Sequence, residues 1–206
     1  MDFPFDSDSE YTDQSFKRIN YRNKTINRKT FQNCIFTNCA FQEATFLNCK
    51  FRDCSFSDCD LRLMHVAGSS FRESIFKHST VTGVNWVEGS WSKSGLLESI
   101  GFIDSEVSYS SFFGLELAKL VMTKCVAKNA DFAEANLTQA DFTETDFAES
   151  RFLHTNLTEA NFTHARNYAI DPGVNKLKDA KFSLPEAINL LRCMNIVLVD
   201  DLAADN

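Results

Sequence analysis

The sequence predicts an all-β solenoid, in which short extended segments alternate with turns and the chain winds into stacked coils. Three observations predict it. A large apolar residue returns at every fifth position, a small residue stands two positions before it, and the large residue is unusually often phenylalanine. The chain has 20 phenylalanines but only 7 glycines and 3 prolines among its 206 residues. Such a composition indicates a repetitive interior filled by one kind of large side chain.

The large apolar residues, termed centres, form two series separated by one extra residue. The centres are Phe16, Tyr21, Ile26, Phe31, Phe36, Phe41, Phe46, Phe51, Phe56, Leu61, Val66, Phe71, Phe76, Val81, Trp86 and Trp91, and then Leu97, Phe102, Val107, Phe112, Leu117, Met122, Ala127, Phe132, Leu137, Phe142, Phe147, Phe152, Leu157 and Phe162. They make about 30 repeats. Five helical residues rotate about 140° from the starting face, and five strand residues reach the opposite face. The backbone must therefore turn a corner once in every repeat.

A second inward position lies two residues before the centre and holds a small residue. These residues are Cys34, Cys39, Ala44, Cys49, Cys54, Cys59, Ser69, Ser74, Ser79, Cys125, Ala130, Ala135, Ala140, Thr145, Ser150, Thr155 and Ala160. A spacing of two is that of a strand, so each repeat is expected to be a short extended segment with two inward side chains, followed by a turn. All cysteines except Cys193 occupy this position, where a thiol acts as a compact apolar filler rather than a metal ligand.

The repeats resemble those of the pentapeptide-repeat family. Runs such as 130–134 and 140–144 match the family motif A(D/N)(L/F)xx, and the resemblance covers residues 14–166. It implies a right-handed quadrilateral β-helix with four repeats in each coil, and hence about seven to eight coils. One column of stacked centres would then contain Phe16, Phe36, Phe56 and Phe76, continued by Leu97, Leu117, Leu137 and Leu157.

The repeat divides the chain into three parts. They are an acidic N-terminal extension at 1–15, the β-helix at 16–166 with a phase slip near 92–96, and a C-terminal cap at 167–206. Gly95 lies in the slip and predicts a hinge; the alternative is that the neighbouring glycines make room for the tryptophans. In the cap, Ser183 and Glu186 form the pattern of a helix start with a capping box.

Apolar residues in the cap predict a homodimer. A stripe at helical spacing ends at Met194, and Ile196–Val199 has the pattern of a strand that is apolar on both sides. A strand with one covered face would alternate between apolar and polar residues, so a second chain is expected to cover the other face. The predicted dimerisation residues are Leu190, Leu191, Met194, Ile196 and Leu198.

The formal charge of −7 is concentrated in the second half of the chain. Before Leu97 there are 12 Lys/Arg and 11 Asp/Glu, and from Leu97 onward 9 and 17, so the halves carry +1 and −8. An acidic surface disfavours direct binding to nucleic acid or to a membrane and favours a basic partner, although solubility explains moderate acidity equally well. The candidate partner-binding residues, expected to point outward in rows, are Asp131, Glu134, Asp141, Glu144, Asp146, Glu149 and Glu159.

No motif in the sequence indicates catalysis, a cofactor or a metal. It has no GxSxG, no phosphate-binding glycine loop and no HExxH, and an interior filled by side chains offers no pocket. We therefore expect a protein without enzyme activity, cofactor or metal. No apolar run approaches the roughly 18 residues of a membrane span, and the acidic N-terminus differs from a secretory signal. A cytoplasmic location is expected.

The layout as a whole resembles the Qnr and MfpA group of the pentapeptide-repeat family, and the stretch 182–198 resembles the closing helix and strand of that group. The resemblance implies a homodimer, joined through the C-terminal cap, that binds DNA gyrase or topoisomerase IV by mimicking duplex DNA. For Qnr members it also implies protection of gyrase from quinolones. Many of these carry two longer loops, whereas this chain shows a single-residue slip, as expected of loopless MfpA-like members. The alternative is an interaction scaffold of the same fold with another partner.

Overall fold

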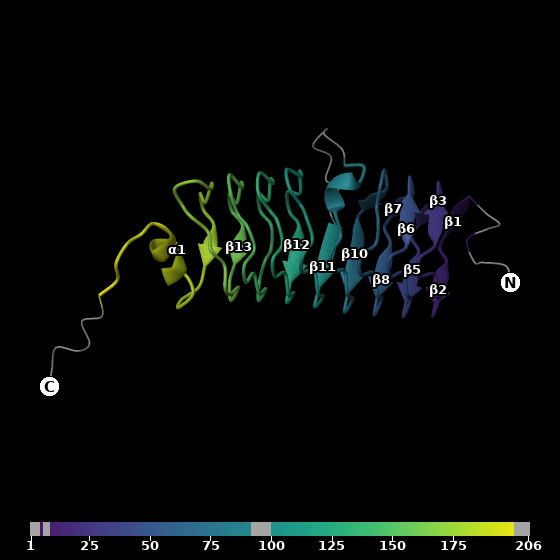
Figure 1. The fold of residues 1–206 in the computed structure, drawn as a ribbon, viewed down its shortest axis with the longest axis horizontal. Coiled ribbons are helices and arrows are strands. Elements are labelled where there is room, and N and C mark those ends of the chain that lie inside the picture. The colour runs from purple at the N-terminus through teal and green to yellow at the C-terminus, as the bar shows by residue number, and fades with distance from the viewer. Residues whose placement is uncertain (1–4, 6–8, 92–99, 200–206) are drawn as a thin grey trace.

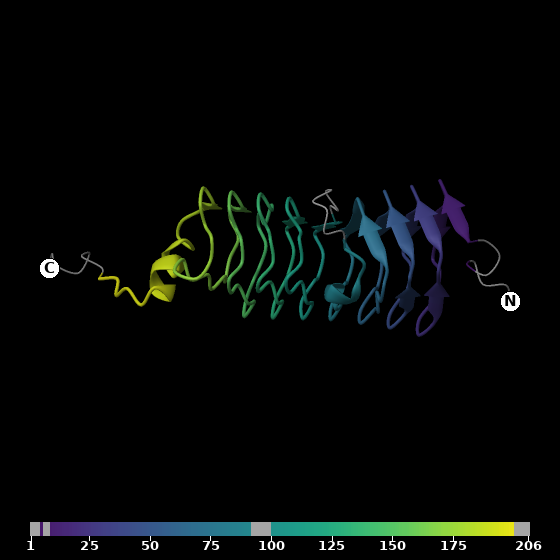
Figure 2. The same ribbon diagram turned by 90° about the horizontal axis from the view of Figure 1, so that it is seen from above.

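The chain forms a straight rod of stacked coils, with its two ends at opposite ends of the rod (Figure 1, Figure 2). The computed structural model describes residues 5, 9–91 and 100–199. In this part the chain is a β-solenoid of about eight turns with one short helix, and its strands pair in parallel. The predicted all-β solenoid is confirmed. No described helix is long and apolar enough to cross a membrane.

Four flat faces surround the core, and we number them in chain order. Face 1 contains β1 (Glu10–Thr12), β4 (Thr30–Gln32), β7 (Lys50–Arg52) and β9 (Ser70–Arg72). Face 2 contains β2 (Ser15–Lys17), β5 (Ile35–Thr37), β8 (Ser55–Ser57), β10 (Ser74–Lys77), β11 (Ile100–Ile103), β12 (Val121–Thr123), β13 (Asn161–Phe162) and β14 (Lys181–Phe182). Face 3 is held by single parallel bridges such as Ala40 with Asp60. Face 4 contains β3 (Thr25–Asn27), β6 (Thr45–Leu47) and the 3-10 turn Trp86–Glu88.

Adjacent coils are offset by four repeats, a difference of 20 in residue number, as between Cys49 and Ser69. Phe36 accordingly lies between Phe16 and Phe56 in the register of face 2. The corners fall two residues after each centre, where the backbone is left-handed, as at Asn33 with φ of 51°. Residues other than glycine seldom adopt this conformation. It is held here by the ladder between coils, since the Asn33 N–H donates to the Arg52 carbonyl at 2.9 Å.

The centres stack in columns inside the rod. Every described centre except Trp91 is buried. In the face 2 column, the Phe56 ring stacks between Phe36 and Phe76, with centroid distances of 4.6 and 4.8 Å. Burial of each such side chain is worth roughly 1.5–3 kcal/mol of transfer free energy. The stacks therefore stabilise strands of only two to four residues.

The small inward residues are also buried, as predicted. Their polar atoms bond to the backbone of neighbouring coils: the Ser69 hydroxyl donates to the Phe46 carbonyl at 2.8 Å and accepts the Cys49 N–H at 2.8 Å. The six inward cysteines are free thiols, and burial raises the pKa of Cys54 and Cys125 to about 12. Their placement confirms that they fill the core. The described residues contain no cluster of three side chains able to hold a metal ion.

The phase slip is an insertion of six residues and not of one. Phe76 pairs with Phe102, and Asn85 with Ser111. The difference in residue number across this coil is therefore 26, where regular coils have 20, as between Cys49 and Ser69; in the last coil Phe152 pairs with Ile170, a difference of 18. Phe102 thus continues the Phe76 column, and the predicted continuation through Leu97 is wrong. Six residues are one whole repeat plus one residue, so the five-residue period of the sequence shows only a shift of one. Gly95, the predicted hinge, and Leu97 lie outside the described residues.

The coils extend beyond both predicted boundaries of the β-helix. β1 begins at Glu10, before the predicted start at 16, and Phe5 closes this end of the core. Phe5 is 1 % exposed, with its ring centroid 5.2 Å from that of Phe16. At the other end β14 pairs with β13, so the ladder continues to Phe182 instead of ending at 166. The pattern disappears after Phe162 because the buried residues that follow no longer recur at every fifth position.

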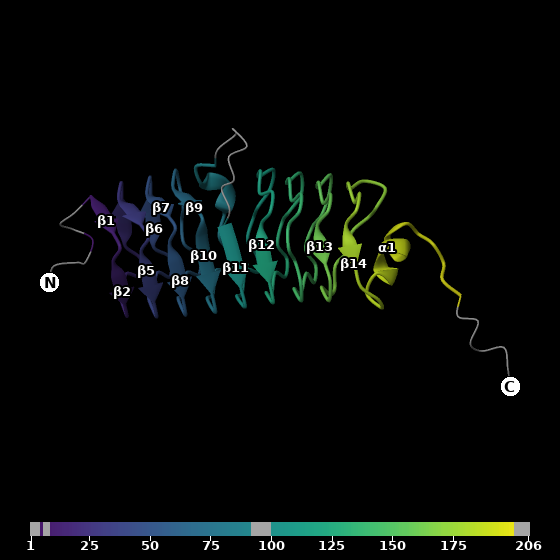
Figure 3. The same cartoon turned by 180° about the vertical axis from the view of Figure 1, so that it is seen from behind.

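The cap contains one described helix, α1 (Ile188–Cys193), which lies across the last coil (Figure 3). The predicted capping box is wrong, because the Ser183 and Glu186 side chains accept hydrogen bonds from backbone N–H groups of the coil and not of the helix; the Glu186 carboxylate bonds to the helix through the Asn189 side chain, at 3.0 Å. Ser183 Oγ accepts the His164 N–H at 2.8 Å, and Glu186 Oε1 accepts the Asn167 N–H at 2.6 Å. The predicted strand at 196–199 does not form in this single chain, where the segment is exposed.

Candidate partner-binding surface

Three positions of each repeat are outward, and the predicted acidic residues occupy two of them. The residue before the centre lies along the wall of the rod, and the residue two places after the centre stands at the left-handed corner. The predicted acidic residues divide between them. Asp131, Asp141 and Asp146 are in the wall, whereas Glu134, Glu144, Glu149 and Glu159 stand at corners.

The three aspartates hold the wall together. Each carboxylate accepts a hydrogen bond from the backbone N–H two residues later, at 3.0 Å for Asp131, 3.1 Å for Asp141 and 3.2 Å for Asp146. This local arrangement is an Asx turn, which stabilises the approach to the corner. Asp131 also lies 3.5 Å from Arg151, and Asp141 accepts the Asn161 amide from the next coil at 3.2 Å. These carboxylates therefore serve the fold.

Asp146 is buried, which corrects the prediction that it points outward. It is 5 % exposed, and its carboxylate lies 3.4 Å from Arg166 and 3.8 Å from Lys128 in the adjacent coils of face 3. The Asn167 amide donates to it at 2.8 Å. Burial alone would raise its pKa, but the hydrogen bonds from Asn167 and the Ala148 N–H and the Arg166 charge together lower the pKa below its usual range.

The four glutamates encircle the rod. All are exposed, at φ of 60 to 61°. They follow centres of faces 4, 2, 3 and 1 in turn, so each stands at a different corner, and the predicted rows along the rod do not form. Glu144, for example, has Lys124 and His164 as its corner neighbours, four repeats before and after it in the adjacent coils. We term these residues the glutamate belt: Glu134, Glu144, Glu149 and Glu159.

Negative charge is dense at this level of the rod. Residues 131–159 contain seven carboxylates and one arginine. They span about one and a half coils, or roughly 7 Å at about 4.8 Å per coil. Duplex DNA carries one charge per roughly 1.7 Å of its axis. The formal charge density of this segment therefore reaches that of a duplex, although two of the aspartates are paired with cations.

The predicted dimerisation residues form an apolar end to the rod. Leu190 packs against the core, whereas the others are 40–48 % exposed, namely Leu191, Met194, Ile196 and Leu198. Val197 and Val199 are 85 % and 80 % exposed. The segment from α1 to Val199 thus presents apolar side chains on more than one side. Such a surface is typical of one that is covered by a second copy of the same chain.

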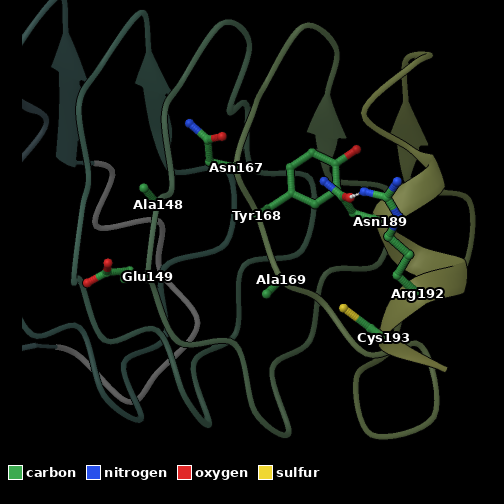
Figure 4. Close-up of a pocket in the computed structure, with 8 residues that line it drawn as sticks. All are labelled: Ala148, Glu149, Asn167, Tyr168, Ala169, Asn189, Arg192 and Cys193. Carbon is green, nitrogen blue, oxygen red and sulfur yellow. Dashed lines mark hydrogen bonds between the residues drawn. The ribbon is translucent and has the colours of Figure 1, made fainter. Parts of the chain in front are cut away.

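A groove of about 540 Å³ separates α1 from the last coils (Figure 4). It lies outside the filled interior, and apolar periodicity could not reveal it because α1 forms one of its walls. The Arg192 guanidinium donates to Asn189 Oδ1 across one side at 3.2 Å. Tyr168 on the opposite side is 2 % exposed, and its hydroxyl has no hydrogen-bond partner among the described residues. The other lining residues are Ala148, Glu149, Asn167, Ala169 and Cys193.

Known structures share this fold along most of the chain. A trypsin-treated form of QnrB1, a plasmid-mediated fluoroquinolone resistance protein, is 17% identical with a TM-score of 0.63, over 97% of this chain and 96% of that one. A second trypsin-treated QnrB1 is 19% identical with a TM-score of 0.64, over 90% and 100%. HetL, involved in heterocyst differentiation regulation in the cyanobacterium Nostoc sp. strain PCC 7120, is 12% identical with a TM-score of 0.54, over 84% and 87%.

Family models match the repeats directly, while no curated protein matches the sequence significantly. The model of the pentapeptide repeat region matches residues 29–112, and that of pentapeptide repeats in eight copies matches residues 122–165. Together they cover more than half of the chain. With the four-repeat offset between coils and the buried centres, these matches show that the chain belongs to the pentapeptide-repeat family.

Proposed function

We propose that the protein binds a type II topoisomerase, DNA gyrase or topoisomerase IV, by mimicking duplex DNA. The observation that carries this proposal is the glutamate belt. A duplex bears phosphates around its whole circumference, so a rod with carboxylates at all four corners imitates it more fully than a rod with one acidic stripe. The shared fold with QnrB1 over nearly the whole chain supports the choice of partner.

The mimic is proposed to be a homodimer joined through the C-terminal cap. The exposed apolar residues from Leu191 to Val199 support an isologous contact about a two-fold axis. Such a dimer would hold two glutamate belts on either side of its centre, and we propose a cytoplasmic location, where a topoisomerase partner would be found.

Quinolone protection forms part of the proposal. A single-residue slip is expected of a loopless member, but the coil between Phe76 and Phe102 has six residues more than a regular coil such as that between Phe36 and Phe56. The chain thus has additional length at one place, as the looped Qnr proteins have. A role as a binding protein without catalysis is proposed for the same surface.

The test is a gyrase supercoiling assay with and without ciprofloxacin. The belt variant carries Glu134→Gln, Glu144→Gln, Glu149→Gln and Glu159→Gln, which remove charge but keep side-chain shape. We expect wild type to inhibit gyrase alone and to restore activity in ciprofloxacin, and the belt variant to lose both effects.

A matched control removes four carboxylates from the same left-handed corner position in the first half of the rod. It carries Glu43→Gln, Asp53→Asn, Asp58→Asn and Glu73→Gln, all exposed at φ of 51 to 56°. We expect it to act like wild type. Equal loss in both variants would mean that overall charge, and not the belt, governs binding.

An interaction scaffold with another partner is the second candidate, supported by the fold shared with HetL. Absence of any effect of wild-type protein on gyrase and topoisomerase IV would favour it over DNA mimicry.

A further inference from the structure

One column of outward residues on face 4 is apolar along most of the rod. It occupies the position directly after each centre, and we term it the face-4 stripe: Leu47, Ala67, Val87, Phe113, Ala133 and Leu153. The ladder fixes its alignment, since the N–H groups of Asn48, Gly114 and Glu134 donate to the carbonyls of Ala67, Ala133 and Leu153 at 2.8–2.9 Å. At about 4.8 Å per coil, five steps give a stripe roughly 24 Å long.

The same position on the other three faces is mainly polar, so the stripe does not follow from the repeat. Face 1 has residues such as Arg52, Arg72 and Thr138 there, and face 3 has Arg62 and Lys128. A solenoid that needed only solubility would be polar on face 4 as well.

The middle of the stripe is exposed to solvent. Val87 is 42 % and Phe113 39 % exposed, and Leu63 and Tyr109, at 50 % and 66 %, stand at the corner between faces 3 and 4. These are four of the five exposed large hydrophobic residues found in the described part of residues 9–170, and Ile35 on face 2 is the fifth. Contiguous exposed apolar surface usually marks an interaction site.

A glycine stands at a corner on each edge of this surface. Gly83 lies between Leu63 and Tyr109 along the corner, and a Cβ added to it would lie 2.6 Å from Leu63 Cδ2. Its φ of +73° also favours glycine. At the other edge of face 4, Gly114 follows Phe113 with φ of +65°, and no described atom lies within 4 Å of the place where its Cβ would be. Leu63 therefore lies against Gly83 at one edge of face 4, whereas the space beside Gly114 at the other edge is open among the described residues.

The stripe is continuous with the acidic surface. Ala133 stands between Asp131 and Glu134 in the chain, and between Phe113 and Leu153 in its column. Ala133 is 0 % exposed although its position is outward, so neighbouring side chains close over it. A protein that binds Glu134 on this side of the rod also reaches the exposed Phe113, which precedes the corner neighbour Gly114 in the adjacent coil.

We propose that the face-4 stripe is a second, apolar contact with the topoisomerase that binds the glutamate belt. This inference rests on the proposed function and adds to it a part of the partner's surface that is apolar. Contacts with the belt weaken as salt screens the charges. Burial of apolar surface does not depend on that screening. The stripe thus gives the protein an apolar contact with the enzyme that DNA, with its charged backbone, cannot make.

The experiment measures the dissociation constant for purified gyrase and topoisomerase IV at a series of salt concentrations. The stripe variant carries Val87→Ser and Phe113→Ser. We expect its dissociation constant to rise about tenfold at every salt concentration, with an unchanged slope against the logarithm of salt. The belt variant, in contrast, should show a smaller slope.

The matched control carries Ile35→Ser and Ile75→Ser, the same chemical change at outward positions of face 2. It should bind like wild type, and circular dichroism should be the same for all variants. If the belt variant binds weakly while the stripe variant binds like wild type, the stripe inference is wrong and the proposed function stands. A stripe variant with a changed slope, or a control as weak as the stripe variant, would also overturn it. Absence of wild-type binding at any salt concentration would overturn both proposals.

Discussion

Asp146 and Glu149 are three residues apart, both acidic and both outside the core column, yet their roles differ. Asp146 is held in the wall by Arg166, Lys128 and Asn167, whereas Glu149 is exposed at a corner. The difference comes from their places in the pentad. A residue before a centre faces the same wall position in the coils above and below, and a corner residue projects away from them.

Substitution at these two positions is expected to separate stability from binding. Asp146→Asn loses the charge that the hydrogen bonds and cations around it favour, and should lower the free energy of unfolding by about 1–3 kcal/mol. Glu149→Gln should change it by less than about 0.5 kcal/mol. Urea unfolding at pH 7 followed by circular dichroism measures both. Equal stabilities would contradict the structural role of Asp146.

The buried thiols predict how stability depends on pH. Burial raises the pKa of Cys54 and Cys125 to about 12, whereas thiols of an unfolded chain ionise near about 8.5. Between these values the unfolded chain loses protons that the folded chain keeps, so stability falls as pH rises and is unaffected below that window. Urea midpoints at pH 8 and pH 10.5 should show the fall. A variant with Cys54→Ala and Cys125→Ala should show a smaller fall, and an equal one would contradict the assignment.

At the scale of elements, the last coil needs the cap because no further coil follows it to accept hydrogen bonds from its outer edge. Ser183 and Glu186 supply acceptors to the N–H groups of His164 and Asn167 in that coil. They do so before α1 begins at Ile188, so the connection to the helix, and not the helix itself, closes this edge of the ladder.

Removal of the Glu186 carboxylate should therefore be detected in the coil. In Glu186→Ala we expect the Asn167 amide to exchange its hydrogen about fivefold faster, since one hydrogen bond contributes about 1 kcal/mol. Exchange at Phe56, in the middle of the rod, should not change. Glu159→Ala, which removes a corner carboxylate, is the control and should leave the Asn167 amide as protected as in wild type.

The inward residues could be predicted well from the sequence, and the elements between the coils less well. Phe56 and Cys54 could be placed because their spacing has only one geometric solution. The register across the insertion could not, since six extra residues and one extra residue give the same phase. The structural role of Asp141 could not be predicted for a different reason: the Thr143 hydroxyl donates to the Asp141 carboxylate in a local pattern that apolar periodicity does not report. Ser183 and Glu186 fit the sequence pattern of a helix start equally well. Only their hydrogen bonds to the N–H groups of His164 and Asn167 show that they bond to the last coil.

Deletion of six residues tests the corrected register. Without residues 93–98 the offset between Phe76 and Phe102 becomes four repeats, so we expect a folded protein with an unfolding temperature within a few degrees of wild type. Deletion of the six residues 113–118 shortens an ordinary coil and should abolish cooperative unfolding, because every later centre loses its column. Calorimetry of both proteins gives the answer. Loss of folding in the first deletion would contradict a six-residue insertion.

For the whole molecule, the rod separates its functions along one axis. The first half is nearly neutral, the glutamate belt follows, and the apolar cap is at the end. In the proposed dimer, the cap would set where the two glutamate belts stand relative to each other. The fold shared with QnrB1 at 17% identity shows that the rod itself tolerates wide changes of sequence.

The protein is expected to sediment as a dimer at micromolar concentration in analytical ultracentrifugation. Leu191→Glu combined with Leu198→Glu places charge in the apolar end and should give monomers with unchanged circular dichroism, because neither residue belongs to the core. Leu63→Glu, an equally exposed leucine on the side of the rod, is the control and should remain a dimer. A wild-type monomer under these conditions would argue against dimerisation through the cap.

The four-repeat offset between coils has a consequence for how such a protein can change its size over evolutionary time. Duplication or loss of one four-repeat unit keeps every remaining centre in its column and alters the rod by one step, about 4.8 Å. Length can therefore be adjusted in discrete increments, independently of the residues at the corners. In the proposed dimer, the number of coils would therefore set the distance between the two acidic belts, and this distance could change in evolution without a change in the core.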